Sequence, residues 1–401
     1  MNIVLINHSD SRGGASVVTY RLMKALRALG HNASMLVVHK DTDDPNVHLA
    51  ASALRAKLPF LKEHLRIFRA CDFSRENLFK ISIATDGLPL AQHPLVGSAD
   101  AVILNWVNQG MLSLDEIALM AKKRRVVWTM HDMWNLTSLC HHAGSCIQYG
   151  QTCSDCHLVC DKALGVRTWQ RKERLYESSP LSFVAVSSWL AEKCRQSSLF
   201  THFEPAVIPN AFPVGEFYIE PIKTRHELNL PADKKIILMG AARLDDPVKG
   251  LPYAVDALNR LKRTDAVAVF YGAIRDASAL SSLKFPHVCL GQVGNSLVAE
   301  LCAHASVVIS SSLYETLPGT IIEGMAGGAT PVAFDSGGQR DIVRNVSEGY
   351  LVSPYDISAF ADAIGAALDS PCRRDEQHRL VSERFSSESV ARAYLELLKI
   401  L

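Results

Sequence analysis

Two carboxylates, Glu315 and Glu323, stand on either side of a short segment that can begin a helix. Pro318 suits the first turn of a helix, where its missing N–H costs nothing. The backbone amides of Gly319 and Thr320 would then face an anion at the helix N-terminus. Because one carboxylate precedes the helix and the other lies more than a turn inside it, they flank this anion from different sides. The pattern indicates a site for a phosphate that carries hydroxylated groups at both ends, such as a sugar nucleotide.

Two cations, Arg243 and Lys249, follow an apolar run at 236–239, and Gly250 comes directly after them. Arg243 offers a planar fork of donors and Lys249 a compact charge. Groups of this kind stabilise negative charge that grows on a departing nucleoside diphosphate. A solvated loop charge is the alternative for either residue alone, but the pair followed by glycine favours a diphosphate clamp.

A glycine pair in the first half of the chain, Gly13-Gly14, lies between the apolar run 3–6 and the amphipathic segment 17–29. Glycine lets the backbone approach a ligand closely, and a helix start favours phosphate. The pattern is not G-x-G-x-x-G, so it does not support dinucleotide binding. An ordinary strand–helix turn is the alternative.

Polar residues also follow the other apolar runs of the first half. His131, with Asp132 beside it, ends the run 126–129, and its place at the carboxyl end of a strand makes it a candidate catalytic residue. A lone histidine at such a place is otherwise a structural hydrogen-bonding group. The pairs Asn105-Trp106 and Ser187-Ser188 could face an acceptor, although capping the next helix is the stronger interpretation.

The spacing Glu-x7-Glu, followed by Pro331-Val-Ala and Gly337-Gly338, resembles retaining glycosyltransferases of family 4 (glycosyl transferases group 1, GT-B fold). The resemblance implies that Glu315 contacts the donor sugar and Glu323 the nucleoside ribose. It also assigns Arg243 and Lys249 to the diphosphate, and it places His131 near the donor sugar. Catalysis in this family needs no metal cofactor.

Further donor contacts follow from the same resemblance. It implies that Gly13 and Gly14 border the diphosphate and the acceptor, and that Leu317 lies in the donor segment. Val293 follows the short run 288–290 and is expected beside the base. The chain departs from the family at 209–211, where it has Pro-Asn-Ala and the family commonly has Asn-Gly.

Length and composition indicate an ordinary globular enzyme with two domains. The chain has 401 residues, 48% hydrophobic and 21% charged, with a net charge of +1. This length exceeds the length that a single hydrophobic core usually stabilises. A net charge so close to zero gives no overall positive potential that would attract nucleic acid. The first residues are too quickly polar for a signal peptide, and no apolar run reaches the length of a membrane span. We expect a cytoplasmic protein.

Short apolar runs alternate with amphipathic segments in both halves, which predicts parallel, doubly wound α/β sheets. The runs in the first half are 3–6, 101–104, 126–129 and 183–186, and those in the second half are 236–239, 266–271, 288–290, 307–309 and 331–334. A proline-rich stretch at 210–234 separates the halves. We expect two Rossmann-like domains of GT-B type facing a cleft, an acceptor-binding domain at 1–212 and a nucleotide-sugar domain at 213–386. The helical segment 387–401 would return to the first domain.

Five cysteines lie within 140–160, and Cys140, Cys146, Cys153 and Cys156 could close a tetrahedral zinc site. Cys-x2-Cys is metal-ligand spacing, and the segment has little apolar periodicity of its own, so a metal could substitute for a core. The longer gaps before Cys153 are not those of a standard finger. Disulfides and free thiols stay open as alternatives. A subset of family 4 has a similar Cys-rich insert after His-Asp-Met-Trp.

Two further patterns concern the metal dependence of the reaction and its location in the cell. Asp41-x-Asp43 matches the metal clamp of the other large glycosyltransferase fold, but it lies in a polar run typical of a surface turn, and we reject it. The segment 54–70 mixes basic and apolar residues at helical spacing, which suits a membrane interface, although Pro59 weakens a continuous helix. A helix with a solvated basic face is the alternative.

Taken together, these features predict a retaining, hexosyl-type glycosyltransferase. It would move a sugar from a UDP- or GDP-linked donor to a glycan or lipid-linked saccharide in cell-surface polysaccharide synthesis. It would bind no nucleic acid and would contact the inner membrane surface peripherally. The alternatives are a sugar-nucleotide epimerase of GT-B layout and a non-catalytic nucleotide-sugar-binding protein.

Overall fold

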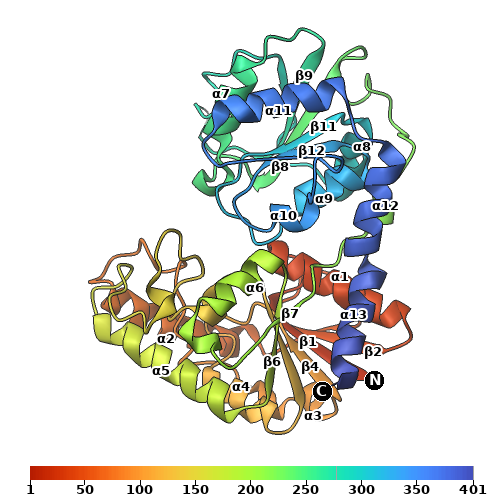
Figure 1. Cartoon of the computed structure of the whole chain (residues 1–401). Coiled ribbons are helices and arrows are strands. Elements are labelled where there is room, and N and C mark those ends of the chain that lie inside the picture. Colours follow the sequence, from red (N-terminus) through yellow and green to blue (C-terminus); the bar gives the residue numbers. More distant parts are fainter. Residues whose placement is uncertain (277, 401) are drawn as a thin grey trace. The chain divides into compact units, whose positions relative to one another are not determined.

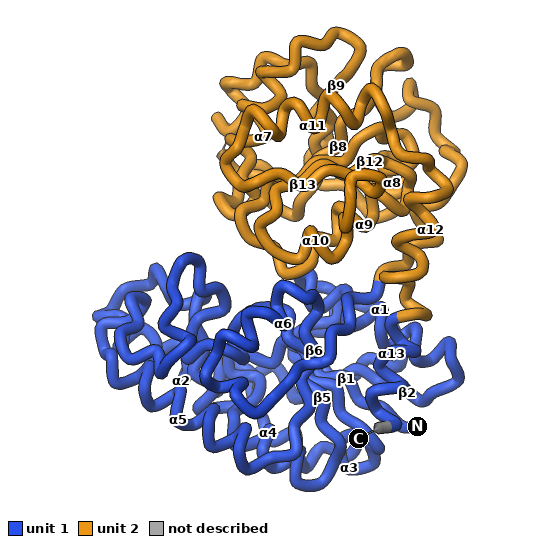
Figure 2. The backbone as a smooth tube through the Cα atoms, in the orientation of Figure 1, with its two compact units in different colours: residues 1–211, 390–401 blue, residues 212–389 orange. Residues whose placement is uncertain are grey.

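The chain folds into two compact units. The structure is a computed structural model that describes residues 1–276 and 278–400. Unit 1 consists of Met1–Ala211 together with the residues from Val390 onward, and unit 2 of Phe212–Ser389 (Figure 2). The sequence predicted that the first domain ends at residue 212 and that the chain returns to it at residue 387. Leu401, the last residue of the expected helix, lies outside the described residues.

Unit 1 is built on a seven-stranded parallel sheet in the order β3-β2-β1-β4-β5-β6-β7. The strands are β1 (Asn2–Ser9), β2 (Asn32–His39), β3 (Val47–Leu49), β4 (Ala101–Leu104), β5 (Arg125–Met130), β6 (Leu181–Ala185) and β7 (Ala206–Val207). The main helices are α1 (Gly14–Ala28), α2 (Ala53–Ala70), α4 (Leu114–Ala121), α5 (Lys162–Ser178) and α6 (Ser188–Arg195). All four predicted runs are strands, and β4 has the predicted bounds. The strands β2, β3 and β7 were not predicted.

The C-terminal helix α13 (Ser387–Ile400) supplies part of the core of unit 1. Val390, Tyr394 and Leu398 are buried among side chains of α1, β1 and β2. The hydroxyl groups of Tyr394 and Thr129 are hydrogen-bonded at 2.7 Å, which ties the helix to β5. Without these residues, one face of the first sheet would expose its apolar side chains to water.

Unit 2 is a six-stranded parallel sheet in the order β10-β9-β8-β11-β12-β13. The strands are β8 (Lys235–Arg243), β9 (Ala266–Ala273), β10 (His287–Cys289), β11 (Val307–Ser310), β12 (Thr330–Phe334) and β13 (Tyr350–Val352). The helices are α7 (Leu251–Arg260), α8 (Asn295–His304), α9 (Gly319–Ala326), α10 (Gln339–Ile342), α11 (Ile357–Asp369) and α12 (Arg374–Phe385). Figure 1 shows α7 and α11 on one face of this sheet and α8 and α9 on the other. The architecture is the predicted one, and only β13 was missed.

No helix within the described ranges has both the length and the apolar content needed to cross a bilayer.

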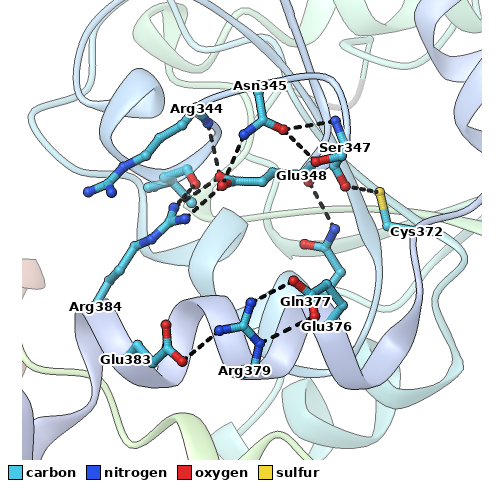
Figure 3. Close-up of polar contacts among 11 residues, drawn as sticks. Arg344, Asn345, Ser347, Glu348, Cys372, Glu376, Gln377, Arg379, Glu383 and Arg384 are labelled. Atoms are coloured by element: carbon cyan, nitrogen blue, oxygen red, sulfur yellow. Dashed lines mark hydrogen bonds and ion pairs between the residues drawn. The ribbon is translucent and has the colours of Figure 1, made fainter.

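A buried ion pair fastens α12 to the loop before β13 (Figure 3). Nη2 and Nη1 of Arg384 donate to the two carboxylate oxygens of Glu348 at 2.7 and 3.0 Å, and the amide of Arg344 donates to Oε2 at 3.0 Å. Burial alone would raise the pKa of Glu348, but Arg384 and this amide hold it below its ordinary value. The side chain of Gln377 also donates to the Glu348 carbonyl, so one residue joins two elements.

We expect Arg384→Met to destabilise unit 2 by about 3–5 kcal/mol, since the carboxylate of Glu348 would remain buried without its partner. Calorimetric unfolding would show this as a lower Tm. The pKa of Glu348 is depressed in the folded state, so its contribution is present at neutral pH and is lost as pH falls through the lowered value. Arg379→Met is the matched control, because Arg379 pairs with Glu376 and Glu383 at the surface, where such pairs contribute less than about 1 kcal/mol. Equal shifts in the two variants would contradict the role of the buried pair.

Candidate functional site

Two loops at the carboxyl end of the unit 2 sheet are joined through their backbones. The loop after β8 contains the short turn η6 (Pro247–Lys249) and then Gly250. The hydroxyl of Ser311, after β11, donates to the carbonyl of Gly250 at 2.9 Å, and the amide of Leu313 donates to the carbonyl of Val248 at 2.8 Å. Gly250 has φ 64° and an added Cβ would overlap the Ser311 carbonyl, so only glycine fits here.

A third loop, after β12, packs equally closely on the segment that carries Glu315. The amide of Gly338 donates to the carbonyl of Glu315 at 2.9 Å. A Cβ at Gly337 would overlap this carbonyl oxygen, and a Cβ at Gly338 would overlap that of Thr316. The glycine pair of the family pattern therefore has a local physical role, which is to let two loop backbones touch.

Glu315 and Lys249, predicted for different ligand groups, contact each other directly. Nζ of Lys249 donates to Oε1 of Glu315 at 2.5 Å. The two side chains are 30% and 19% exposed, so the pair is accessible from solvent and only partly screened by it. The sequence placed both residues at one strand edge but gave no sign of this pairing.

Arg243 is paired within its own loop. Its Nε lies 3.5 Å from Oδ1 of Asp245, and its Nη2 lies 3.3 Å from Oδ2 of Asp246. The Nε atom is buried and has no hydrogen-bond partner among the residues that the structure describes. The guanidinium is thus held in place by two carboxylates while its Nε donor stays unused.

Helix α9 begins where the sequence indicated an anion site, with one correction. Pro318 is the N-cap residue with extended backbone rather than part of the first turn, and the helix starts at Gly319. No side chain caps the helix, so side chains leave the first amides unoccupied. Leu317 is buried in front of the helix, and Thr320 is half-buried in its first turn. Burial raises the pKa of the Tyr271 phenol, and Cys302 and then Glu323, which lies on α9, raise it further.

The loop after β10 contacts the end of strand β9. The amide of Gly272 donates to the carbonyl of Gly291 at 2.7 Å. Val293 follows in the same loop and is half-buried before α8. The expected place of Val293 beside a base stays a prediction.

In unit 1 the glycine pair opens helix α1. Gly13 is its N-cap with φ 90°, a conformation that favours glycine, and no side chain caps the helix. Around Gly14 an added Cβ would meet open space. The nearby Arg12 donates to both carboxylate oxygens of Asp41 at 2.8 and 2.6 Å. This pairing occupies the first carboxylate of the rejected Asp41-x-Asp43 motif.

His131 lies at the end of β5 and its Nε2 is 3.0 Å from Oδ1 of Asn105. Burial lowers the pKa of His131 to about 4, although Asp132 opposes this shift. The imidazole is therefore neutral at physiological pH and can exchange hydrogen bonds without adding charge. Asn105 binds His131 rather than capping a helix, whereas Ser187 caps α6 through the amide of Leu190.

A hydrogen-bond network holds the loop after His131 and was not predicted. Asp132 Oδ2 lies 2.7 Å from Nδ1 of His141 and accepts from Nε1 of Trp106 at 3.0 Å. Nε2 of His141 lies 3.1 Å from the Ser82 hydroxyl. Burial would raise the pKa of Asp132, but His141 and a backbone amide lower it to about 2. His141 follows Cys140, so the Cys-rich segment itself contacts this loop. The sequence shows that His141 is next to Cys140, but it does not show that His141 contacts Asp132.

The four predicted zinc ligands lie near one another but do not form a preorganised metal site. Cys140, Cys153 and Cys156 influence one another electrostatically, and Cys146 influences Cys153 and Cys156. Burial raises the pKa of Cys140 to about 12 and that of Cys153 to about 11. Across residues 1–276 and 278–400, no three cysteine, histidine or acidic side chains are placed to hold a metal ion. All ten cysteines are free thiols.

A cavity in unit 1 lies at the carboxyl ends of β1 and β2, against helix α2. Its volume is about 380 Å³, and its lining includes His8, His39, Phe60 and Met111. The ring of His8 packs edge-on against that of Trp106. Ligands of open α/β sheets bind at such strand ends, which makes this cavity a candidate ligand pocket.

Comparison with known proteins supports this fold. Residues 233–370 match the family model described as glycosyl transferases group 1, so unit 2 contains that domain. The structure resembles sucrose-phosphate synthase from Thermosynechococcus elongatus (TM-score 0.69, 19% identity, covering 99% of this chain and 98% of that one). It also resembles Anabaena HepE in complex with UDP-glucose (TM-score 0.66, 16% identity, 100% and 99%). The protein has the GT-B fold.

Two curated relatives match over part of the chain. A D-inositol 3-phosphate glycosyltransferase of Xylanimonas cellulosilytica is 31% identical over 186 residues, 43% of this chain and 44% of the relative. A phosphatidyl-myo-inositol mannosyltransferase of Mycobacterium leprae is 27% identical over 225 residues, 55% and 58% respectively. The matches span about half the length of these relatives.

We expect Gly337→Ala to displace the loop that carries Glu315 and to lower stability by about 1–3 kcal/mol, as overpacking does. Faster hydrogen exchange at the amides of Thr316 and Leu317 would report the displacement. Gly215→Ala is the matched control in the same unit, since its Cβ would meet no atom within 4 Å. Unchanged exchange and Tm in Gly337→Ala would show that the close contact is not required.

Proposed function

We propose that the protein is a retaining glycosyltransferase that moves a hexose from a UDP- or GDP-linked donor to a glycan or lipid-linked saccharide. Unit 2 would bind the nucleotide sugar and unit 1 the acceptor. The Lys249–Glu315 contact in front of an uncapped helix start carries the proposal. A cation for phosphate, a carboxylate for sugar hydroxyls and free amides stand together there. The group 1 domain at 233–370 supports the same assignment.

The donor would be divided among the groups of unit 2 by charge. Arg243, Lys249 and the first amides of α9 would bind the diphosphate, because its charge grows as the glycosidic bond breaks. Glu315 would hold sugar hydroxyls and favour the cation-like ring of the transition state. Glu323 would bind the ribose. Leu317 and Val293 would line the nucleoside.

The leaving phosphate would take the proton of the acceptor, so no protein carboxylate would need to attack the sugar. This geometry retains the anomeric configuration. His131, as a neutral imidazole, would position a sugar hydroxyl, and the network of Asp132 and His141 would hold its loop. The Gly13-Gly14 helix start would border the diphosphate and the acceptor. The reaction would need no metal.

The acceptor class indicates where the enzyme would act. The resemblance to HepE bound to UDP-glucose and to a phosphatidyl-myo-inositol mannosyltransferase supports a nucleotide sugar and a lipid-linked acceptor. We propose a role in cell-surface polysaccharide synthesis at the cytoplasmic face of the membrane, with peripheral contact to its surface.

Turnover of UDP- and GDP-sugars with and without saccharide acceptors tests the proposal. Acceptor-dependent release of nucleoside diphosphate is expected, and NMR should show an α-linked product from an α-configured donor. Interconversion of the donor without transfer would instead identify an epimerase. Binding of the donor without any turnover would identify a non-catalytic binding protein, and an inverted product would overturn the mechanism.

We expect Arg243→Ala and Lys249→Ala each to lower kcat by about two to three orders of magnitude, as loss of a transition-state charge stabiliser does. Circular dichroism should stay unchanged. Lys284→Ala removes an exposed cation of the same unit and should leave turnover intact. Near-normal rates in both clamp variants would rule out the assignment.

Glu315→Gln and Glu323→Ala should have different consequences. Loss of the Glu315 charge should lower kcat by about 100-fold or more with nearly unchanged nucleotide affinity, because the sugar ring and not the nucleotide needs that charge. Glu323→Ala should weaken nucleotide binding, measured by calorimetry, through loss of the ribose contact. Full activity of Glu315→Gln would contradict its role.

We also propose a structural zinc ion bound by Cys140, Cys146, Cys153 and Cys156. Binding would draw the neighbouring thiols inward as thiolates and stabilise a segment with little regular structure. Elemental analysis should find about one zinc per chain, lost together with thermal stability in Cys153→Ser or Cys156→Ser. The exposed Cys289 provides the control Cys289→Ser. Metal-free protein from zinc-replete cells would remove this proposal.

A further inference from the structure

Helix α2 (Ala53–Ala70) exposes four leucines in one line. Leu54, Leu58, Leu61 and Leu65 are 81, 56, 50 and 49% exposed. At about 100° per residue, they fall within an arc of about 60° on the helix surface. We call these four residues the leucine stripe. Pro59 does not interrupt the helix, contrary to the sequence expectation.

The stripe is exposed because the opposite side of α2 is anchored in unit 1. Ile67 and Glu63 are fully buried. Oε1 of Glu63 accepts the amides of Ile83 and Ala84 at 2.8 and 3.2 Å. Rotation of the helix to bury the leucines would break these bonds and expose Ile67. Single exposed leucines are ordinary, but an aligned set on a fixed helix marks an interaction surface.

The charges beside the stripe all have one sign. The exposed ionisable residues of α2 are cations, namely Arg55, Lys57, Lys62, Arg66 and Arg69. Its one acid, Glu63, is buried. Arg66 pairs with Asp86, whereas no ion pair of the other four appears among the residues that the structure describes. The surface is therefore apolar along its centre and positive along its flanks.

We propose that the leucine stripe and its flanking cations dock unit 1 on an anionic lipid bilayer. The leucines would enter the boundary between headgroups and acyl chains, and the cations would meet lipid phosphates. Phe73 and Phe79, 65 and 68% exposed, follow the helix and add apolar surface near it. The inference deepens the proposed function, because it identifies the surface by which the enzyme would reach a lipid-linked acceptor.

Charge complementarity selects the bilayer over a second copy of the chain. Two copies joined through their stripes would bring ten cations together with no exposed acid on either helix. Like charges at close range oppose such a dimer. An anionic membrane surface instead attracts each basic residue near it.

Sedimentation with lipid vesicles tests the docking without any use of turnover. Wild-type protein should bind vesicles that contain phosphatidylglycerol more tightly than vesicles of phosphatidylcholine alone, and salt should weaken this preference. The affinity of Leu58→Gln/Leu61→Gln for these vesicles should be lower by about tenfold or more, because the variant lacks two of the leucines that would insert into the bilayer. Leu119→Gln is the matched control, since Leu119 is a 43% exposed leucine on α4 of the same unit.

A charge variant separates the two parts of the surface. Lys57→Gln/Lys62→Gln should lose most of the preference for anionic vesicles while it retains the fold by circular dichroism. Failure of the wild-type protein to bind anionic vesicles would overturn the proposal, and so would equal binding by the leucine variant. A wild-type dimer that becomes a monomer in the leucine variant would assign the stripe to self-association instead.

The test is independent of the proposed chemistry. Transfer to a soluble saccharide acceptor, measured without vesicles, should be the same in Leu58→Gln/Leu61→Gln and in the wild type. Vesicle binding without any transfer would refute the proposed function and leave the docking surface in place. Transfer without vesicle binding would refute the docking surface and leave the proposed function in place.

Discussion

The candidate donor site depends on backbone contacts that only glycine allows. Three loops at the carboxyl end of the second sheet approach so closely that a Cβ at Gly250, Gly337 or Gly338 would overlap a carbonyl oxygen of the neighbouring loop. These contacts fix the position of Glu315 from its backbone, before any side chain acts. They also bring Lys249 within reach of Glu315. Rigid backbone support of this kind is what a preorganised charged site requires.

The cations of this site are paired with carboxylates of the same unit. Lys249 faces Glu315, and Arg243 faces Asp245 and Asp246. A lone phosphate must compete with these carboxylates for the cations. A ligand that brings hydroxyl groups for the carboxylates as well as charge for the cations satisfies both partners at once. Internal pairing thus favours a sugar-linked diphosphate over a simple anion, because the simple anion leaves a carboxylate unpaired.

The strands of both sheets were largely predictable from sequence because buried parallel strands are short continuous apolar runs. The strand β4 shows this most clearly, since all four of its residues are buried. The strand β2 was missed although residues 35–38 form a continuous apolar run as long as that of β4. Helix α2 was doubted for Pro59, yet tertiary burial of that residue outweighs its propensity.

The sequence predicted where the candidate residues lie along the strands, but not which residues they contact. Arg243 ends β8, Glu315 follows β11 and His131 follows β5, at the strand ends where ligands of such sheets bind. The pairs Lys249–Glu315 and Asp132–His141 join residues whose separation in space no local pattern records.

The helix that closes the first core has a consequence for the order of synthesis. Val390, Tyr394 and Leu398 belong to the core of unit 1, yet they follow the whole of unit 2 in the chain. A ribosome therefore releases residues 1–211 long before the side chains that complete their core exist. Unit 2 can become compact first, while the nascent first unit keeps an apolar face uncovered. During translation this face stays uncovered until helix α13 has been made and can pack on it.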